Sequence, residues 1–183
     1  MSTILERLIS ESQTLHISKN RDFLQIRPAN PKDIEMLGVL WFYQRCYHEL
    51  WDELYASVPS AQHDWKKLVE SYLDQPNHCI LVAEDIDEKI VGYIHGSFHP
   101  WPMSPFQQYG SLNTIAVTPG AQGQGIGKRL VRALLKWFKK QDIEHISIHV
   151  DYRNRIALKM YKNVGFRPYQ QRLMLNLAIE NQL

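Results

Sequence analysis

The sequence predicts an α/β domain, in which β-strands and helices alternate along 183 residues. Two apolar runs, residues 78–84 and 90–99, flank a charged turn and predict a β-hairpin. A glycine-rich loop at residues 122–128 opens directly into an amphipathic helix with apolar residues at helical spacing. A further β-like run, residues 146–150, precedes a second helix that ends near residue 166.

Residues 1–20 are predicted to form an amphipathic helical extension that packs on the domain or on a second subunit, so a homodimer is one alternative. Residues 21–183 form the domain itself. Residues 23–28 alternate in polarity and predict its first strand, which stops at a proline. The next helix begins at Asn30, with proline at its first position, and runs to about residue 50.

That helix carries five aromatic residues, which either pack in the core or form the wall of a substrate cleft. They are Trp41, Phe42, Tyr43, Tyr47 and Trp51. Another helix is predicted over residues 62–74. Gly92 and Gly96 indicate bulges or the close approach of a ligand. Residues 100–105 contain three prolines and predict a loop that is either a pocket border or a plain connector, and a last strand is predicted at residues 172–178.

The composition is that of an ordinary globular protein, with 44% hydrophobic and 22% charged residues. No apolar run approaches the roughly 20 residues that a membrane helix needs, so no membrane segment is expected. Charged residues interrupt the first turns of the chain, which argues against a signal peptide. Cys46 and Cys79 have no metal-binding spacing and are interpreted as buried structural thiols. We therefore expect a cytoplasmic protein without a metal site.

The charges are unevenly distributed. Residues 120–183 carry 12 Lys and Arg against 4 Asp and Glu, whereas residues 1–119 carry 9 against 15. One half could therefore meet an anion and the other a cation, unless the two halves are simply solvated faces that differ. The basic residues do not alternate with aromatic residues, so nucleic-acid binding is not expected.

The glycine-rich loop has the features of an anion site, because glycines allow close approach of the backbone and the helix N-terminus offers free N–H groups. A Walker loop would need Ser or Thr after Lys128, where this chain has Arg129. A dinucleotide fingerprint would need G-x-x-G spacing directly after the strand, and residues 118–121 intervene here. Asp151 could imitate its ribose-binding acid, so nucleotide binding stays an alternative, as does a purely structural turn.

The chain resembles the GCN5-related N-acetyltransferase (GNAT) superfamily in two motifs that lie about 30 residues apart. The first motif is matched by Gln122, Gly125 and Gly127, after a strand that ends in Ile115-Ala116-Val117. The second is matched by Asn154, Ala157, Tyr161, Gly165 and Phe166. The resemblance covers about residues 24–177. It implies a mixed, mostly antiparallel sheet with helices on both faces, splayed where coenzyme A (CoA) enters.

The resemblance also implies roles for individual residues. The pyrophosphate of acetyl-CoA would lie on the loop amides, with Lys128 or Arg129 near a phosphate and Gln122 orienting the loop. The pantetheine arm would pair with the strand that ends at Val117. Tyr161 would protonate the leaving thiolate as general acid, although it could also be a packing residue. The residues expected to bind acetyl-CoA are Ile115, Ala116, Val117, Gln122, Gly123, Gln124, Gly125, Ile126, Gly127, Lys128 and Asn154, and Asn154 could instead be only a helix cap.

The chain departs from the family at the general base, which must take a proton from the attacking amine. Many relatives carry a glutamate on the central strand, in the region where this chain has Asn113-Thr114. The remaining candidates are His95, His149, Glu49 and Glu53, or a base that acts through water. The Val117 amide would donate a hydrogen bond to the oxyanion.

The sequence thus predicts an acetyl-CoA-dependent N-acetyltransferase that acts by direct attack in a ternary complex. The acidic N-terminal half and the aromatic helix favour a small cationic amine as acceptor. The alternatives are a peptide or protein amine as acceptor, and a non-catalytic acyl-CoA-binding regulatory module.

Overall fold

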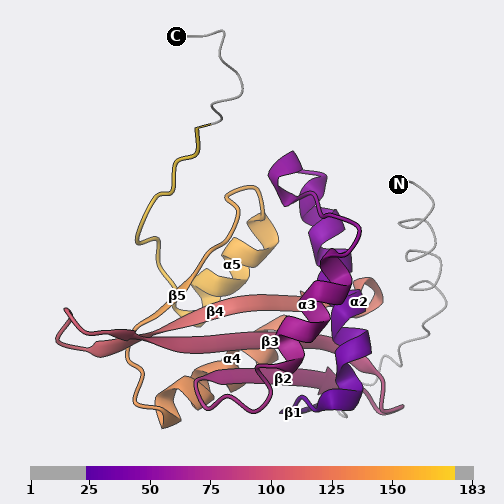
Figure 1. Cartoon of the computed structure of the whole chain (residues 1–183), viewed down its shortest axis with the longest axis horizontal. Helices are drawn as coiled ribbons and strands as arrows, with labels where there is room; N and C mark the ends of the chain where they lie inside the picture. Colours follow the sequence, from indigo (N-terminus) through magenta and orange to yellow (C-terminus); the bar gives the residue numbers. More distant parts are fainter. Residues whose placement is uncertain (1–23, 176–183) are drawn as a thin grey trace, which may run out of the picture.

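The computed structural model describes residues 24–175, so the expected helical extension of residues 1–20 lies outside the described residues. Figure 1 shows a sheet at the centre of the molecule. Its strands lie side by side in chain order, with β1 to β4 antiparallel and β5 parallel to β4. They are β1 (Gln25–Pro28), β2 (His78–Glu84), β3 (Ile90–Trp101), β4 (Gln107–Val117) and β5 (Ile146–Ile148). The predicted mixed, mostly antiparallel sheet is confirmed.

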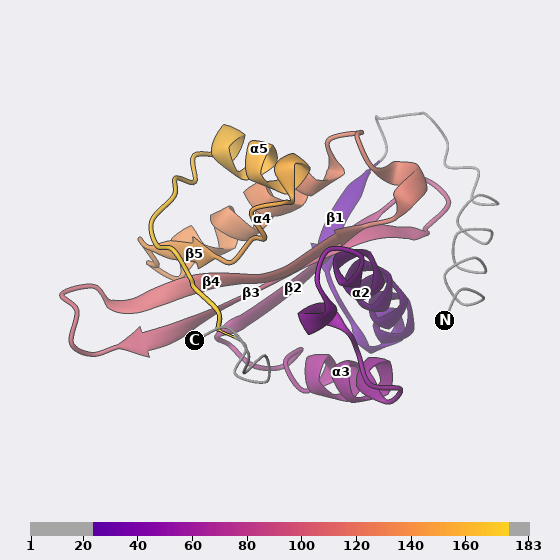
Figure 2. The same ribbon diagram turned by 90° about the horizontal axis from the view of Figure 1, so that it is seen from above.

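Helices cover both faces of the sheet, as predicted. Helices α2 (Ile34–Glu49) and α3 (Ala61–Glu70) lie on one face, and α4 (Ile126–Lys140) and α5 (Arg155–Val164) on the other (Figure 2). Short 3₁₀ segments connect some of these elements, namely η2 (Pro31–Asp33), η3 (Glu53–Tyr55) and η4 (Pro119–Ala121). None of the described helices is both long and apolar enough to cross a membrane.

Each face of the sheet has its own apolar cluster. Ile94 on β3 packs with Leu134 and Phe138 of α4, and all three are at most 1% exposed. On the opposite face, Leu37 of α2 and Tyr93 of β3 are fully buried. Because burial of one such side chain stabilises the fold by about 2 kcal/mol, the two clusters fix the helices against the sheet. Alternate residues of β3 therefore serve opposite clusters.

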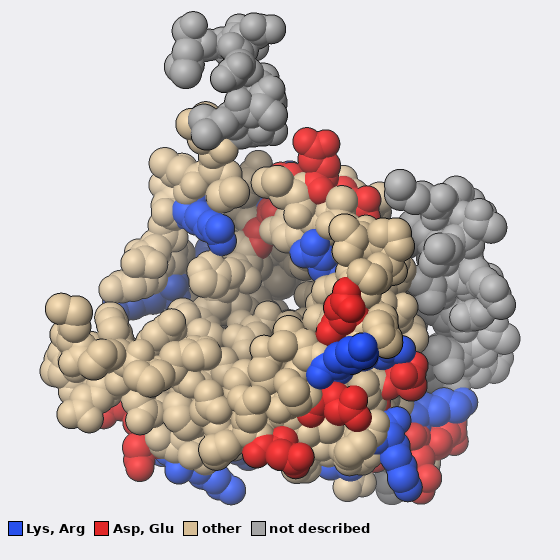
Figure 3. Space-filling model, viewed as in Figure 1, with Lys and Arg blue, Asp and Glu red and all other residues tan. Residues whose placement is uncertain are grey.

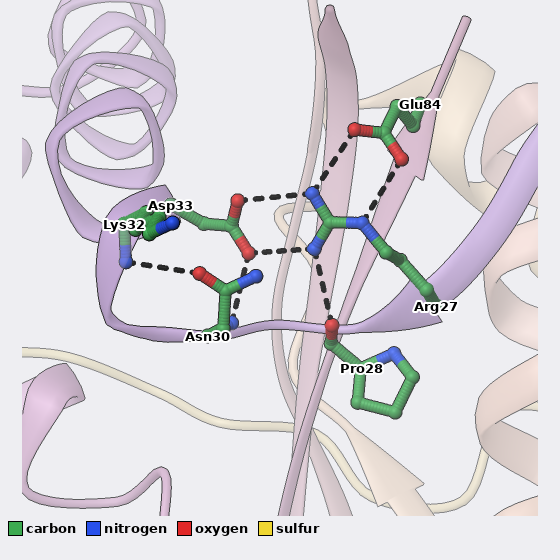
Figure 4. A network of polar contacts seen from close by, with 6 residues as sticks. All are labelled: Arg27, Pro28, Asn30, Lys32, Asp33 and Glu84. Atoms are coloured by element: carbon green, nitrogen blue, oxygen red, sulfur yellow. Dashed lines mark hydrogen bonds and ion pairs between the residues drawn. The ribbon is translucent and has the colours of Figure 1, made fainter. Parts of the chain in front are cut away.

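An ion-pair network joins β1, β2 and the start of α2 (Figure 4). The guanidinium of Arg27 donates to Asp33 at 2.7 and 3.1 Å and to Glu84 at 2.9 and 3.1 Å. Asp33 also accepts the main-chain N–H of Asn30 at 2.8 Å, and the Asn30 side chain accepts the N–H of Lys32 at 3.0 Å. The predicted helix start at Asn30 is thus a capping box, and Arg27 ties it to the sheet.

The glycines of β3 have a packing role. The paired positions shift between His95 and Gly96, which confirms the predicted irregularity at Gly96. A Cβ atom on Gly96 would lie 2.7 Å from Leu134 of α4, and one on Gly92 would lie 2.9 Å from the carbonyl oxygen of Ala116. The close approach at Gly96 therefore comes from a helix of the core, because only a residue without a side chain lets α4 approach this strand.

Two predicted elements are wrong in extent. Residues 100–105 were expected to form a loop, but β3 continues to Trp101 and only the tip of the hairpin is irregular. Pro100 is tolerated because β2 pairs with β3 only as far as Ser97, which leaves this part of β3 a free edge among the described residues. Residues 172–175, the described part of the expected last strand, form no strand, since alternating apolar residues become a strand only when a partner edge pairs with them.

Candidate functional site

The edge of β4 that faces β5 is open over its C-terminal half. Strand β5 pairs with β4 at Gly110, Ser111 and Leu112, and no described strand pairs with that edge beyond Leu112. The N–H of Thr118 donates to Val91 of β3 at 2.9 Å. Because main-chain groups alternate in direction along a strand, those of Val117 point the opposite way, toward the open edge. An extended ligand can pair there with main-chain groups.

A β-bulge lies where this edge opens. Thr114 pairs with His95 and Leu112 pairs with Gly96, so Asn113 is an extra residue of β4. Leu112 and Ile115 both contact the core cluster beneath α4. The bulge therefore lets Leu112 and Ile115 both face α4 although two residues separate them, and Asn113 lies on the α2 and α3 face beside His95 and Ser97.

On that face Asn113 joins a polar network on three neighbouring strands. Its Nδ2 donates to Ser97 Oγ at 2.9 Å and lies 3.4 Å from Nε2 of His95. Nε2 of His95 is 2.9 Å from Nδ1 of His78, and Ser97 Oγ is 2.9 Å from Nε2 of His99. Of this set, only His95 is a predicted base. His78 and Asn113 come from other strands, so no fixed spacing along the sequence links them to His95.

Both imidazoles of the closest pair are held neutral near pH 7. Burial and, to a smaller extent, the neighbouring His78 together lower the pKa of His95 to about 4. Burial also lowers the pKa of His78, with a smaller effect of the same sign from His99. The Tyr72 ring stacks on His78 with 4.0 Å between ring centroids and covers the pair from the turn after α3.

The glycine-rich loop sits at the N-terminus of α4. Gly123 and Gly125 have φ angles of 75° and 84°, and Gly125 is the N-cap of the helix. A Cβ atom at either glycine would meet no atom within 4 Å, so these residues provide left-handed backbone beside open space. By contrast, a Cβ atom on Gly127 would lie 3.0 Å from Met160 Sδ of α5. The free N–H groups of the first turn of α4 suit an anion.

Side chains of the loop hold its shape. The amide of Gln122 donates to the carbonyl of Val117 at 3.0 Å, and that of Gln124 donates to the carbonyl of Gly120 at 3.2 Å. Ile126 is buried in the core, so only its main chain can face a ligand. Arg129 donates to the carbonyl of Leu24 at 2.6 Å, so its guanidinium is hydrogen-bonded to the residue before β1. Lys128 is the remaining cation of the helix start.

The second motif lies on α5 and packs beside the loop. The Asn154 side chain accepts the N–H of Ala157 at 3.0 Å and is the N-cap of α5, while its Nδ2 bonds to no other described residue. Tyr161 is 5% exposed, and its ring packs edge-on against Phe166 with 5.7 Å between centroids. Burial raises the pKa of Tyr161 above its ordinary value, so its hydroxyl keeps its proton at neutral pH.

The other proposed bases lie in different surroundings. Glu53 in η3 is exposed, Glu49 ends α2 and is half-buried, and His149 is exposed just after β5. None of these three has a hydrogen bond to another described side chain. Within residues 24–175, His95 alone among the four candidates is buried in a polar network.

A cluster that sequence analysis missed joins the end of α2 to the β5–α5 loop. Arg153 donates to Asp151 at 2.7 and 2.9 Å and to Asp52 at 3.1 Å, and it also bonds the carbonyl of Trp51. Tyr55 donates to Asp151 at 3.3 Å. Figure 3 shows a hollow above β4, between α5 and the end of α2, and this cluster ties together the two segments that flank it.

Comparison with known proteins assigns the family. The model of the acetyltransferase (GNAT) family matches residues 37–166. The mycothiol acetyltransferase of Renibacterium salmoninarum is 31% identical over 86 residues, which is 47% of this chain and 25% of that protein. The chain thus spans about a quarter of the length of this relative.

Solved structures share the fold. A tetramutant of the BH1408 protein of Bacillus halodurans matches with a TM-score of 0.75 and 21% identity, over 83% of this chain and 99% of that one. An aminoglycoside acetyltransferase from an uncultured soil metagenomic sample, in complex with sisomicin, matches with a TM-score of 0.63 and 22% identity, over 85% and 95%. From the match of the family model over more than half of its length, the chain belongs to the acetyltransferase (GNAT) family.

Proposed function

We propose that the chain transfers an acetyl group from acetyl-CoA to a primary amine by direct attack in a ternary complex. The observation that carries this proposal is the open edge of β4 ending at a glycine loop on a helix N-terminus. An extended arm on the strand and an anionic group on the loop are the two ends of one ligand of the CoA type. Membership of the family supports the same assignment.

The residues present fit such a ligand. Main-chain groups of Ile115 and Val117 would pair with the pantetheine arm. The side chain of Ala116, between them, is buried in the apolar cluster under α2. The amides of residues 123–128 and the Lys128 ammonium would hold the pyrophosphate, because the space beside Gly123 and Gly125 is open. The free Nδ2 of Asn154 would donate to the arm. Bound acetyl-CoA supplies the thioester that the amine attacks.

The chain's own groups would act on the reacting atoms. The Val117 N–H points to the open edge and would donate to the carbonyl oxygen as it gains charge. The hydroxyl of Tyr161 would donate its proton to the leaving sulfur, and its raised pKa keeps that proton available at neutral pH. We favour His95 as the base, because it lies 3.4 Å from Asn113, in the region of β4 where many relatives carry a glutamate.

A small cationic amine is the acceptor we propose. Aromatic rings gather at and just after the end of α2, with His48 stacked on Trp51 at 5.1 Å between ring centroids. The faces of such rings attract a compact cation. The similar aminoglycoside acetyltransferase, solved with sisomicin, supports a small-molecule acceptor, as does the name of the mycothiol relative.

A thiol-release assay with acetyl-CoA and a panel of amines tests the proposal, together with thermal shifts on addition of CoA. Turnover with a small amine supports the proposal. Turnover with peptides alone would show that the acceptor is a peptide or protein amine and not a small molecule. A thermal shift with CoA but no turnover would select a regulatory acyl-CoA-binding module, which the absence of a carboxylate at Asn113 favours. A shift with NAD or ATP and none with CoA would overturn the proposal.

A further inference from the structure

The two imidazoles of His78 and His95 form a hydrogen-bonded pair at the centre of the sheet face, 2.9 Å apart. The planes of the two rings are nearly parallel, with an interplanar angle of 22°. His95 is 5% exposed, and His78 is half-buried at the start of β2. The contact is a hydrogen bond and not packing alone, because at this distance one nitrogen must carry a proton and the other must accept it with its lone pair.

Among residues 24–175, the hydrogen-bonding and stacking contacts of the pair come from uncharged side chains. Tyr72 stacks on both rings from the turn after α3, with centroids 4.0 Å from His78 and 5.4 Å from His95. Asn113 lies beside His95 from β4. The nearest further titratable group on this face is His99 of β3, which bonds to Ser97. The described contacts therefore keep both rings neutral, and a neutral imidazole can accept a proton.

The pair lies at the position where the sheet opens. His95 pairs with Thr114, next to the bulge residue Asn113, and β5 leaves β4 after Leu112. Strands are about 4.8 Å apart, so a ligand arm on the open edge of β4 would run about 10 Å from the backbone of β3. Asn113 is exposed and stands between that edge and the His95 ring.

We propose that His95 takes the proton of the acceptor amine and passes a proton on to His78, so that this imidazole pair replaces the carboxylate that β4 lacks. The inference rests on the proposed acetyl transfer. Nδ1 of His95 bonds to no other described residue and is the accepting atom. Its Nε2 proton moves to Nδ1 of His78, whose Nε2 proton leaves to solvent. Both rings remain neutral, and each then returns to its first tautomer.

The groups already named account for every proton and bond in the transfer. The reacting group is the neutral form of the amine, which has already lost its extra proton to solvent. Its nitrogen forms the C–N bond and loses one proton to His95, while the C–S bond breaks and the sulfur takes the Tyr161 proton. Tyr161 regains from solvent the proton that His78 released. Asn113 has a positioning role, since its amide bonds Ser97 Oγ at 2.9 Å and lies 3.4 Å from Nε2 of His95.

Three variants test the relay in the full chain, namely His95→Gln, His78→Gln and the matched control His63→Gln on the exposed surface of α3. We expect kcat to fall about 100-fold or more in His95→Gln and about tenfold in His78→Gln, with KM for acetyl-CoA within twofold of wild type. The control should match wild type. Thermal shifts with CoA that are equal in all variants show that each still folds and binds.

The pH profile separates a relay from a merely structural contact. The base must be unprotonated, so kcat falls as the pH drops through its pKa. His78 lowers the pKa of His95, so His78→Gln should move the acidic limb to higher pH. A His95→Gln variant within twofold of wild type, or a His78→Gln limb that does not move, overturns the relay while acetyl transfer stands. A wild-type protein without turnover on any amine overturns both.

Discussion

The side-chain amide of Gln122 donates to the main-chain carbonyl of Val117 across 3.0 Å, and so ties the glycine loop to the end of β4. That carbonyl points to the open edge of the strand, where it would otherwise have no partner among the described residues. The bond therefore sets the distance between the two parts of the proposed ligand site, the strand edge and the helix N-terminus.

Removal of this bond should weaken CoA binding. We expect Gln122→Ala to raise the Kd for CoA about fivefold, the equivalent of about 1 kcal/mol for one neutral hydrogen bond, with kcat little changed. Calorimetry with CoA measures it. The matched variant is Gln124→Ala, which loses a bond of 3.2 Å to Gly120 within the same turn and should have a smaller effect. Equal effects in the two variants would contradict a specific role for the strand-to-loop bond.

Replacement of Tyr161 by Phe should lower turnover and leave CoA affinity unchanged. The ring fills the same space against Phe166, whereas the proton donor is lost, so we expect kcat to fall about 10²- to 10⁴-fold. Steady-state kinetics and a CoA titration give the two numbers. Tyr152→Phe serves as the control, because Tyr152 is 73% exposed and lies in the loop just before α5, the helix that carries Tyr161. An unchanged rate in Tyr161→Phe would remove the assigned acid.

The Arg27 network should make an acid-sensitive contribution to stability. Burial alone would raise the pKa of Asp33, but the hydrogen bonds from Arg27 and from the Asn30 N–H lower it below its ordinary value. A carboxyl with a lowered folded pKa stabilises the fold above its unfolded pKa of about 4, and this stabilisation is lost as the pH falls through the folded pKa. Asp33→Asn should therefore be less stable than wild type at pH 7, and the difference should shrink below about pH 4.

We expect Asp33→Asn to lower the free energy of unfolding by about 2 kcal/mol at pH 7. This loss lies between the losses typical of breaking an exposed ion pair and a buried one. Urea unfolding at several pH values measures it. The comparison variant is Glu35→Gln, which breaks an ion pair of 2.8 Å with Lys66 in which the Glu35 side chain is 82% exposed. It should change stability by less than about 1 kcal/mol. A pH-independent Asp33→Asn effect would argue against the lowered pKa.

Tyr93→Phe should not destabilise the protein. Tyr93 is fully buried between the sheet and Trp65, and its hydroxyl has no hydrogen-bond partner among the described residues. Its removal relieves a desolvated polar group, so we expect stability equal to wild type or higher by about 1 kcal/mol. Thermal unfolding measures the change. Tyr93→Leu, which also removes ring volume, should cost more, and a loss above 1 kcal/mol in Tyr93→Phe would reveal an unseen partner of the hydroxyl.

The sequence by itself determined the order and type of most elements, because local signals control them. Two apolar runs on either side of a charged turn specified β2 and β3, and the Asn30 capping box specified the start of α2. The left-handed glycines at 123 and 125 follow from the loop motif, and α4 begins directly after them. The pattern at residues 172–175 was also a local signal, but a strand needs a partner edge, and the prediction was wrong there.

Only the tertiary structure decided which side chains meet. A bulge inserts one residue between Leu112 and Ile115, so that both face α4 and Asn113 lies on the opposite face, and no composition or spacing in β4 predicts this insertion. The bulge brings Asn113 to His95, and antiparallel register brings His95 within 2.9 Å of His78 on another strand. Register and bulges depend on how strands pack against the helices, since Leu134 and Phe138 of α4 press on the glycines of β3 and β4. The sequence offered His95 as one of four candidate bases, and packing joined it to His78, which no sequence pattern had singled out.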